Sequence, residues 1–201
     1  MPPEGYIQKV REICSKYNVL MIADEIQTGF GRTGELFACD HENSKPDMVL
    51  LGKALGGGVY PISAIVTTKE ITGPDVIKPG THGSTFGGNP LASTVALKSL
   101  QIHIEDHLAE RAKRLGTYFI EGLKKIVEKG SKVPVKEVRG KGLLIAIEFK
   151  ADARHIVEEL KDNGILAKYT HSTTIRFAPP LIINQEEINL ALNVIEKVLI
   201  I

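Results

Sequence analysis

Two short, unbroken apolar runs constrain the fold of this chain more than any other feature. They occupy residues 19–23 and 48–51, and neither contains a polar side chain. Continuous apolar runs of this length are typical of strands that are covered on both faces, as in a parallel sheet. The segment between them is long enough for a parallel crossover. The sequence therefore predicts an α/β fold built on a parallel sheet.

Each of these runs is followed by a charged residue beside a glycine-rich loop. Asp24 comes directly after the first run, and Lys53 follows the second run after Gly52. Ligands bind beyond the carboxyl ends of parallel strands, so a carboxylate and an amine are predicted to face one pocket. Strand ends also carry charges simply because charged groups prefer water. The neighbouring glycines favour a binding site, because they let backbone approach a ligand closely.

The remaining periodicity divides the chain into two predicted domains, residues 1–100 and 101–201. The first contains the glycine-rich loops with their charged residues, and the second is predicted as a small α/β or α+β domain, because helical and strand patterns alternate there in short units. Predicted helices cover residues 4–17, 89–104, 108–127, 153–162 and 185–200; predicted strands, besides the two runs, cover 62–66, 136–139, 143–149, 165–167 and 174–177.

Composition excludes several classes of function. The 201 residues include 25 Lys and Arg against 24 Asp and Glu, so a formal net charge of +1 provides no field for a nucleic-acid backbone. The apolar runs are far shorter than the roughly 20 residues that a membrane span needs. No export leader is recognisable. The two cysteines are expected to be reduced thiols in the cytoplasm.

Two other patterns in the sequence resemble known ligand-binding motifs. Gly29 to Gly34 satisfies G-x-G-x-x-G, but five residues separate it from the strand end and no helix pattern follows, so a dinucleotide site is not expected. His103 and His107 are four residues apart, which would place both imidazoles on one helical face as metal ligands. Solvated histidines at a helix end are the favoured interpretation, and a metal-dependent hydrolase is kept as a remote alternative.

Three segments together resemble the class-III, pyridoxal-phosphate-dependent aminotransferases. They are 24–34, 52–58 and 81–90, and the later segments 163–168 and 174–181 are similar to the ornithine aminotransferase branch. The resemblance implies part of the large parallel-sheet domain of fold-type I pyridoxal phosphate enzymes followed by a small carboxyl-terminal α/β domain. It covers essentially the whole chain but corresponds to only the second half of such enzymes.

The resemblance also implies a role for each matching residue. Lys53 matches the lysine that holds the cofactor aldehyde covalently and then moves the proton, and Asp24 matches the partner of the pyridine nitrogen. Gln27 matches the residue that hydrogen-bonds the ring hydroxyl. Ser84 and Thr85 match the pair that reaches the cofactor phosphate in the neighbouring subunit's site. Arg176 matches the arginine that takes a substrate carboxylate.

The implied reaction moves the side-chain amine of ornithine to 2-oxoglutarate, giving glutamate semialdehyde and glutamate. The residues that would select ornithine over acetylornithine or 4-aminobutyrate belong to the half that this chain does not match. The chain is expected to act as a homodimer or with a separate amino-terminal half, and to be poorly soluble or to associate by itself. A catalytically inactive, truncated aminotransferase is the main alternative.

Overall fold

The computed structural model describes residues 1–78 and 80–200, and the contacts within it form two compact units. The amino unit comprises residues 2–30 and 35–107, and the carboxyl unit comprises residues 31–34 and 108–200. The contacts thus divide at residue 107, whereas periodicity placed the division near residue 100. The short segment 31–34 packs with the carboxyl unit although the chain on both sides of it belongs to the amino unit.

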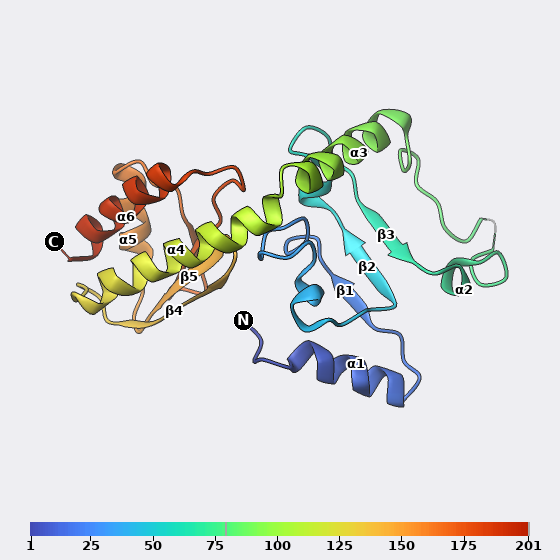
Figure 1. The fold of residues 1–201 in the computed structure, drawn as a ribbon, viewed down its shortest axis with the longest axis horizontal. Coiled ribbons are helices and arrows are strands. Elements are labelled where there is room, and N and C mark those ends of the chain that lie inside the picture. Colours follow the sequence, from blue (N-terminus) through green and yellow to red (C-terminus); the bar gives the residue numbers. More distant parts are fainter. Residues whose placement is uncertain (79, 201) are drawn as a thin grey trace. The chain divides into compact units, whose positions relative to one another are not determined.

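The amino unit is built on a three-stranded sheet in the order β1–β2–β3 (Figure 1). The strands are β1 (Ile22–Asp24), β2 (Met48–Leu51) and β3 (Ala64–Thr67). β1 and β2 are parallel, with Asp24 beside Leu50, which confirms the pairing predicted for the two apolar runs. β3 runs antiparallel to β2, so the sheet is mixed.

The first apolar run is not covered on both faces, as runs of this kind usually are in a parallel sheet. This agrees with the expectation that a chain matching half of the family's length leaves apolar surface and a sheet edge open. Val19, Leu20 and Ile22 are 56%, 53% and 54% exposed, and the strand itself covers only residues 22–24. The physical reason is that β1 is an edge strand, which pairs with β2 alone among the described residues. A run that reads as a central strand therefore lies open to solvent.

The described residues of the amino unit also form helices and short 3-10 turns: α1 (Tyr6–Lys16), α2 (Lys69–Thr72), α3 (Pro90–Glu105), η1 (Ala38–Glu42) and η2 (Lys53–Gly56). Helix α3 begins as predicted, because the Asn89 side chain accepts a hydrogen bond from the Ala92 N–H (2.9 Å) and Pro90 occupies the first helical position. A small core forms around Phe30, Leu51 and Leu55.

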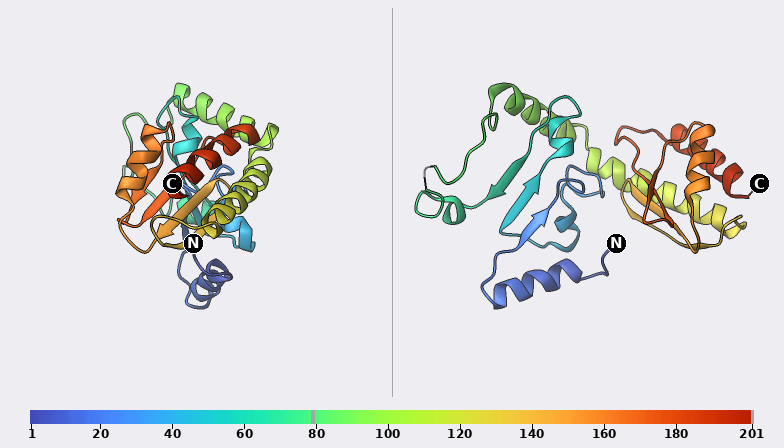
Figure 2. Two further views of the ribbon diagram at one scale, coloured as in Figure 1. Left: turned by 90° about the vertical axis from the view of Figure 1, so that its left-hand side faces the viewer. Right: turned by 180° about the vertical axis from the view of Figure 1, so that it is seen from behind.

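The carboxyl unit is an antiparallel sheet in the order β4–β5–β7–β6 with helices packed on one face (Figure 2). Burial alternates along β5, and its odd-numbered residues join the core beneath the helices. The bounds are β4 (Val135–Lys141), β5 (Leu144–Phe149), β6 (Lys168–Thr170), β7 (Thr174–Phe177), α4 (Leu108–Glu128), α5 (Arg154–Asp162) and α6 (Gln185–Ile200). None of the helices in the described part of the chain combines the length and apolarity that crossing a membrane requires.

The strand predicted at residues 165–167 is wrong, because the strand that pairs with β7 is 168–170. Ile165 instead closes the end of α5, since its N–H donates to the Leu160 carbonyl (2.8 Å). The preceding Gly164 has a φ of 86°, which turns the chain out of the helix. An apolar triplet thus serves as a helix stop here.

Candidate functional site

Asp24 is the last residue of β1, and its exposed side chain lies where the strand gives way to a turn. One carboxylate oxygen, Oδ1, accepts a hydrogen bond from the backbone N–H of Ile26 (3.0 Å). The strand pairing continues one step further, because the Glu25 N–H donates to the Leu50 carbonyl (3.0 Å). The carboxylate is therefore held at the carboxyl edge of the parallel pair.

Lys53 stands at the same edge, two residues beyond the end of β2 and at the start of η2. Its side chain is exposed, and its backbone φ is 45°. The left-handed conformation costs a non-glycine residue about 1 to 3 kcal/mol, and strain of this kind clusters at functional sites. The turns after β1 and β2 also touch, since a Cβ placed on Gly52 would lie 3.3 Å from Ile26 Cγ2. Asp24 and Lys53 thus come from two turns in contact.

Glu25 is a residue whose role was not predicted from the sequence. Its side chain holds the turn that carries Gln27 by hydrogen bonds within that turn and to the Cys39 backbone. It is only 2% exposed, and Oε1 accepts a hydrogen bond from the Cys39 N–H (2.9 Å). The Thr28 hydroxyl donates to Oε2. Strand alternation was the available signal, since adjacent acids at a strand end must point to opposite sides.

This buried carboxylate also affects the neighbouring thiol. Burial, and next the negative charge of Glu25, raise the pKa of Cys39 to about 12. Gln27 lies exposed within the same turn. The glutamate side chain therefore fixes the turn from inside, while the amide of Gln27 is left available on the outside.

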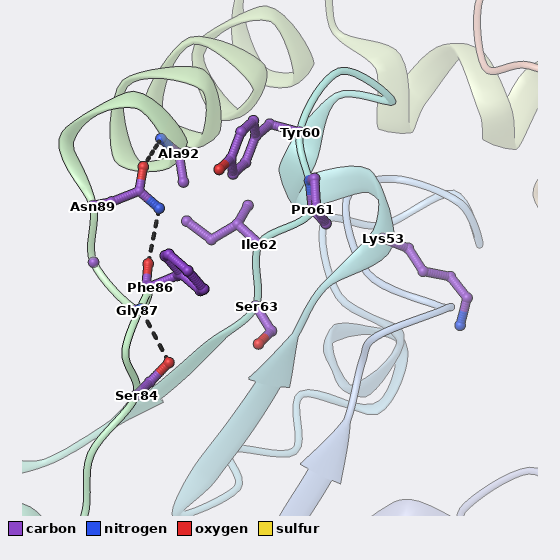
Figure 3. Close-up of a pocket in the computed structure, with 11 residues that line it drawn as sticks. Lys53, Tyr60, Pro61, Ile62, Ser63, Ser84, Phe86, Gly87, Asn89 and Ala92 are labelled. Atoms are coloured by element: carbon purple, nitrogen blue, oxygen red, sulfur yellow. Dashed lines mark hydrogen bonds between the residues drawn. The ribbon is translucent and has the colours of Figure 1, made fainter.

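A cavity of about 600 Å³ opens between the start of β3 and the segment that leads into α3. Ser84 lines it and accepts a hydrogen bond at Oγ from the Gly87 N–H (3.0 Å), and Asn89 Nδ2 donates to the Phe86 carbonyl (2.8 Å). Lys53 also contributes to the lining, but its amine extends away from Ser84 and Asn89 (Figure 3). The amine and the Ser84 hydroxyl therefore do not converge within one chain. Thr85 is exposed and does not line this cavity.

Arg176 belongs to the carboxyl unit, in the middle of β7. Its register partners are Ala146 on β5 and Lys168 on β6. The Nε atom is buried and has no hydrogen-bond partner in the described structure. A buried donor without a hydrogen-bond partner costs free energy. The Nε–H of Arg176 would therefore gain from an acceptor such as a carboxylate oxygen.

Arg32 is a second residue whose role the sequence did not reveal. Its guanidinium donates to the carbonyls of Pro179 (2.6 Å) and Leu143 (3.2 Å), and its own carbonyl accepts the Leu143 N–H (3.0 Å). Burial lowers its pKa below the ordinary arginine value. Arg32 thereby fixes segment 31–34 to the carboxyl unit, and one of its acceptors, Pro179, follows closely after Arg176 in the sequence.

The spacing argument for a metal at His103 and His107 is wrong. Helix α3 ends at Glu105, and His107 lies beyond it with a φ of 50°, so the two rings do not share a helical face. His103 Nδ1 is hydrogen-bonded to the Ser99 carbonyl (2.7 Å), and its ring packs edge-on against Phe30. Among the described residues, no cluster of three or more His, Cys, Asp or Glu side chains could hold a metal.

The residues present fit the cofactor that the resemblance implies. A cofactor with an aldehyde, a pyridine nitrogen and a ring hydroxyl requires an amine, a carboxylate and an amide or hydroxyl donor. Lys53, Asp24 and Gln27 supply these three kinds of group from the two turns at one edge of the sheet, and all three side chains are exposed. The donor set is therefore chemically suited to pyridoxal phosphate.

Comparison with known proteins identifies the family that this chain matches. The model of the family described as Aminotransferase class-III matches residues 1–199. An ornithine aminotransferase from Oceanobacillus iheyensis is 52% identical over 199 residues, which are 99% of this chain and 48% of that protein. The chain therefore spans about half the length of the curated relatives it matches.

Solved structures give the same result. Ornithine aminotransferase from Plasmodium yoelii is 49% identical with a TM-score of 0.92, covering 98% of this chain and 52% of the other. Acetylornithine aminotransferase from Elizabethkingia anophelis is 48% identical, also with a TM-score of 0.92, covering 98% of this chain and 50% of the other. Relatives named for two different substrates are thus equally similar to this chain.

Proposed function

The chain belongs to the class-III aminotransferases, and from that premise we propose that it takes part in moving the side-chain amine of ornithine to 2-oxoglutarate. The products are glutamate semialdehyde and glutamate. The observation that supports the proposal is that the turns after β1 and β2, which carry Asp24 and Lys53, are in contact at one edge of the parallel pair. The names of the relatives favour ornithine as the amino donor.

Pyridoxal phosphate, when bound, supplies an aldehyde that carries the amino group and a ring that accepts electrons. Lys53 holds the aldehyde through its amine and afterwards moves a proton at the substrate carbon. Asp24 keeps the ring nitrogen protonated, because a carboxylate beside it favours the charged form. Gln27 donates a hydrogen bond to the ring hydroxyl oxygen. Arg176 binds a substrate carboxylate in a bidentate manner.

We propose that Ser84 and Thr85 bind the cofactor phosphate of a neighbouring subunit. The direction of the Lys53 amine, away from Ser84, supports this (Figure 3). A homodimer would bring a Ser84–Thr85 pair from one subunit to the Lys53 of the other. The cytoplasm is the proposed location, because Cys14 and Cys39 are both free thiols.

Activity is proposed to require a polypeptide equivalent to the first half of the relatives. The matched relatives are about twice as long as this chain, and β1 has an unpaired edge among the described residues. Apolar side chains are exposed around it, including Val19, Leu20 and Ile22. A strand and helices from the complementary half would cover the kind of surface that a parallel sheet buries.

Cofactor attachment is the first test. The chain is incubated with pyridoxal phosphate, with and without the first half of the Oceanobacillus iheyensis relative, then reduced with borohydride and mapped by mass spectrometry. We expect the cofactor mass on Lys53, and we expect it to disappear in Lys53→Arg. Lys45, an exposed lysine in the same unit, is the control site. Labelling of Lys45 as strong as that of Lys53 would contradict a specific site.

Transamination is the second test. Ornithine, acetylornithine and 4-aminobutyrate are offered separately with 2-oxoglutarate to the mixture of both halves, and glutamate is measured. We expect the highest rate with ornithine. Specific labelling of Lys53 without any turnover would favour the catalytically inactive alternative, and a higher rate with acetylornithine would reassign the donor.

A further inference from the structure

We propose that Lys168 is the second cation of an anion site centred on Arg176, and that the two side chains together select a dicarboxylate. The inference rests on the proposed function and deepens it, because 2-oxoglutarate is a dicarboxylate and ornithine is not. Lys168 acts as a specificity-determining residue for the oxo acid.

The strand register brings the two cations together. Lys168 on β6 lies directly opposite Arg176 on β7 in an antiparallel pair. Residues so paired point to the same face, with Cβ atoms about 4.5 to 5.5 Å apart. This face is opposite to the helices, because Ile175 and Phe177, on either side of Arg176, belong to the core. Two like charges directly opposite each other destabilise a sheet unless an anion lies between them.

On this face, the described acidic side chains of Glu148 and Glu137 are paired with cations other than Arg176 and Lys168. In register, the row across the sheet reads Arg139, Ala146, Arg176, Lys168. Glu148 accepts hydrogen bonds from Lys136 (2.6 Å) and Arg139, and these bonds lower its pKa. Glu137 also pairs with Arg139. The β4 end of the row is therefore neutralised, while the β7–β6 end keeps two positive charges.

The Arg176 end of the row also has a small neighbour and an unmet hydrogen-bond donor. Ala146, the partner of Arg176 on β5, has a side chain of a single methyl group. The Arg176 Nε atom is buried without an acceptor. An incoming carboxylate would satisfy this donor, and a planar guanidinium binds it bidentately.

The two side chains differ in what they can recognise. Arg176 suits a carboxylate in fixed geometry, whereas the Lys168 ammonium is a point charge on a flexible stem. A ligand with a second carboxylate gains attraction from Lys168. A ligand with a second ammonium, such as ornithine, is repelled by it. Lys168 therefore favours the oxo-acid half of the reaction.

Anion binding to the full chain tests this without catalysis. The Nε–Hε signal of Arg176 is followed by NMR during titration with glutarate or propionate at constant ionic strength. We expect glutarate to bind more tightly than propionate, and Lys168→Gln to weaken glutarate binding by roughly three- to tenfold while propionate changes little. The matched control is Lys141→Gln, an exposed lysine on β4 that is not paired with Arg176.

Equal glutarate affinities for Lys168→Gln and the unmodified chain would overturn the proposal. So would equal weakening by Lys168→Gln and Lys141→Gln, since that would reflect net charge alone. Glutarate that leaves the Arg176 signal unmoved would also overturn it. In a mixture that turns over, Lys168→Gln is expected to raise KM for 2-oxoglutarate and not for ornithine.

Failure of this inference is distinguishable from failure of the proposed function. Loss of Lys53 labelling concerns the amino unit, and an absence of transamination leaves the glutarate titration readable, because the titration needs neither the cofactor nor turnover. An unchanged glutarate affinity in Lys168→Gln, in turn, says nothing against cofactor attachment at Lys53.

Discussion

Two adjacent carboxylates show how a residue acquires its role from its surroundings. Asp24 is exposed at the end of β1 and accepts one hydrogen bond, from the backbone N–H of Ile26. Glu25, the next residue, is 2% exposed and binds the Cys39 N–H and the Thr28 hydroxyl. Both are acids at the same strand end, yet one is available to a ligand and the other stabilises the turn. The difference arises because successive side chains of a strand point to opposite sides.

Arg32 is predicted to stabilise the carboxyl unit. Arg32→Met removes the donors to the Pro179 and Leu143 carbonyls, so the free energy of unfolding should fall by about 2 to 3 kcal/mol. Amide hydrogen exchange of β5 and β7 measures this. Arg114→Met, an exposed arginine on α4, should change stability by less than about 0.5 kcal/mol. Equal losses in both variants would contradict the assignment.

Asp47 is predicted to give the amino unit an acid-sensitive contact. Hydrogen bonds from the Met21 N–H and then from Arg11 lower its pKa. A lowered folded-state pKa means that the stabilisation is complete above the unfolded value of about 3.9 and is lost as pH falls through the folded value. The stability difference between the unmodified chain and Asp47→Asn should therefore shrink on acidification, measured by circular dichroism during urea unfolding. A difference that stays constant down to acid pH would contradict this.

At the scale of elements, packing overrides local preference in helix α4. Gly116 lies within this helix, where alanine is ordinarily the better residue. A Cβ placed on Gly116 would lie 1.9 Å from the Gly142 carbonyl oxygen, which is backbone of the turn between β4 and β5. The glycine is therefore required by the close approach of the helix to that turn.

Gly116→Ala is predicted to destabilise the carboxyl unit by roughly 3 kcal/mol or more, because neither the helix backbone nor the turn can move away cheaply. Gly122→Ala is the matched control in the same helix. Its Cβ would meet Leu192 Cδ1 at 2.5 Å, and this flexible side-chain end can shift. In thermal unfolding, the Tm of Gly116→Ala should be well below the Tm of Gly122→Ala. The reverse order of the two Tm values would contradict the packing argument.

At the scale of the whole molecule, the sheet of the amino unit leaves much apolar surface exposed. Ile22 on β1 and Ile65 on β3 are 54% and 60% exposed, and the outer edge of β1 has no partner in the described part of the chain. Unpaired edges and exposed apolar faces favour association. The relatives, being about twice as long, have additional chain that could cover this surface.

The chain alone is therefore predicted to self-associate. Analytical ultracentrifugation should show an average molecular mass that rises with protein concentration. The double variant Ile22→Lys/Ile65→Lys should show a smaller rise, because burying charges in an apolar contact is unfavourable. Leu166→Lys changes a side chain of the carboxyl unit that is 85% exposed, and it serves as the control for general hydrophobicity. A concentration-independent monomer, or an equal effect of Leu166→Lys, would contradict the prediction.

Local sequence was sufficient for the longer helices, for several strands and for the two charged strand ends, whereas the short helix α2 was not predicted. Asn89 and Pro90 mark the start of α3, and the strands 48–51 and 174–177 have the predicted bounds. Asp24 and Lys53 were recognisable because each follows an apolar run beside glycines. These features depend on residues that are close together in the sequence, so the sequence alone is sufficient to predict them.

Only the tertiary structure decided which residues meet across the chain. The antiparallel course of β3, the exposed edge of β1, the burial of Glu25, the bonds from Arg32 to Leu143 and Pro179, and the pairing of Lys168 with Arg176 all join distant segments. Strand register and burial are set by the packing of whole elements against one another. A single sequence does not state which element will be its neighbour, so these contacts became visible only in the folded chain.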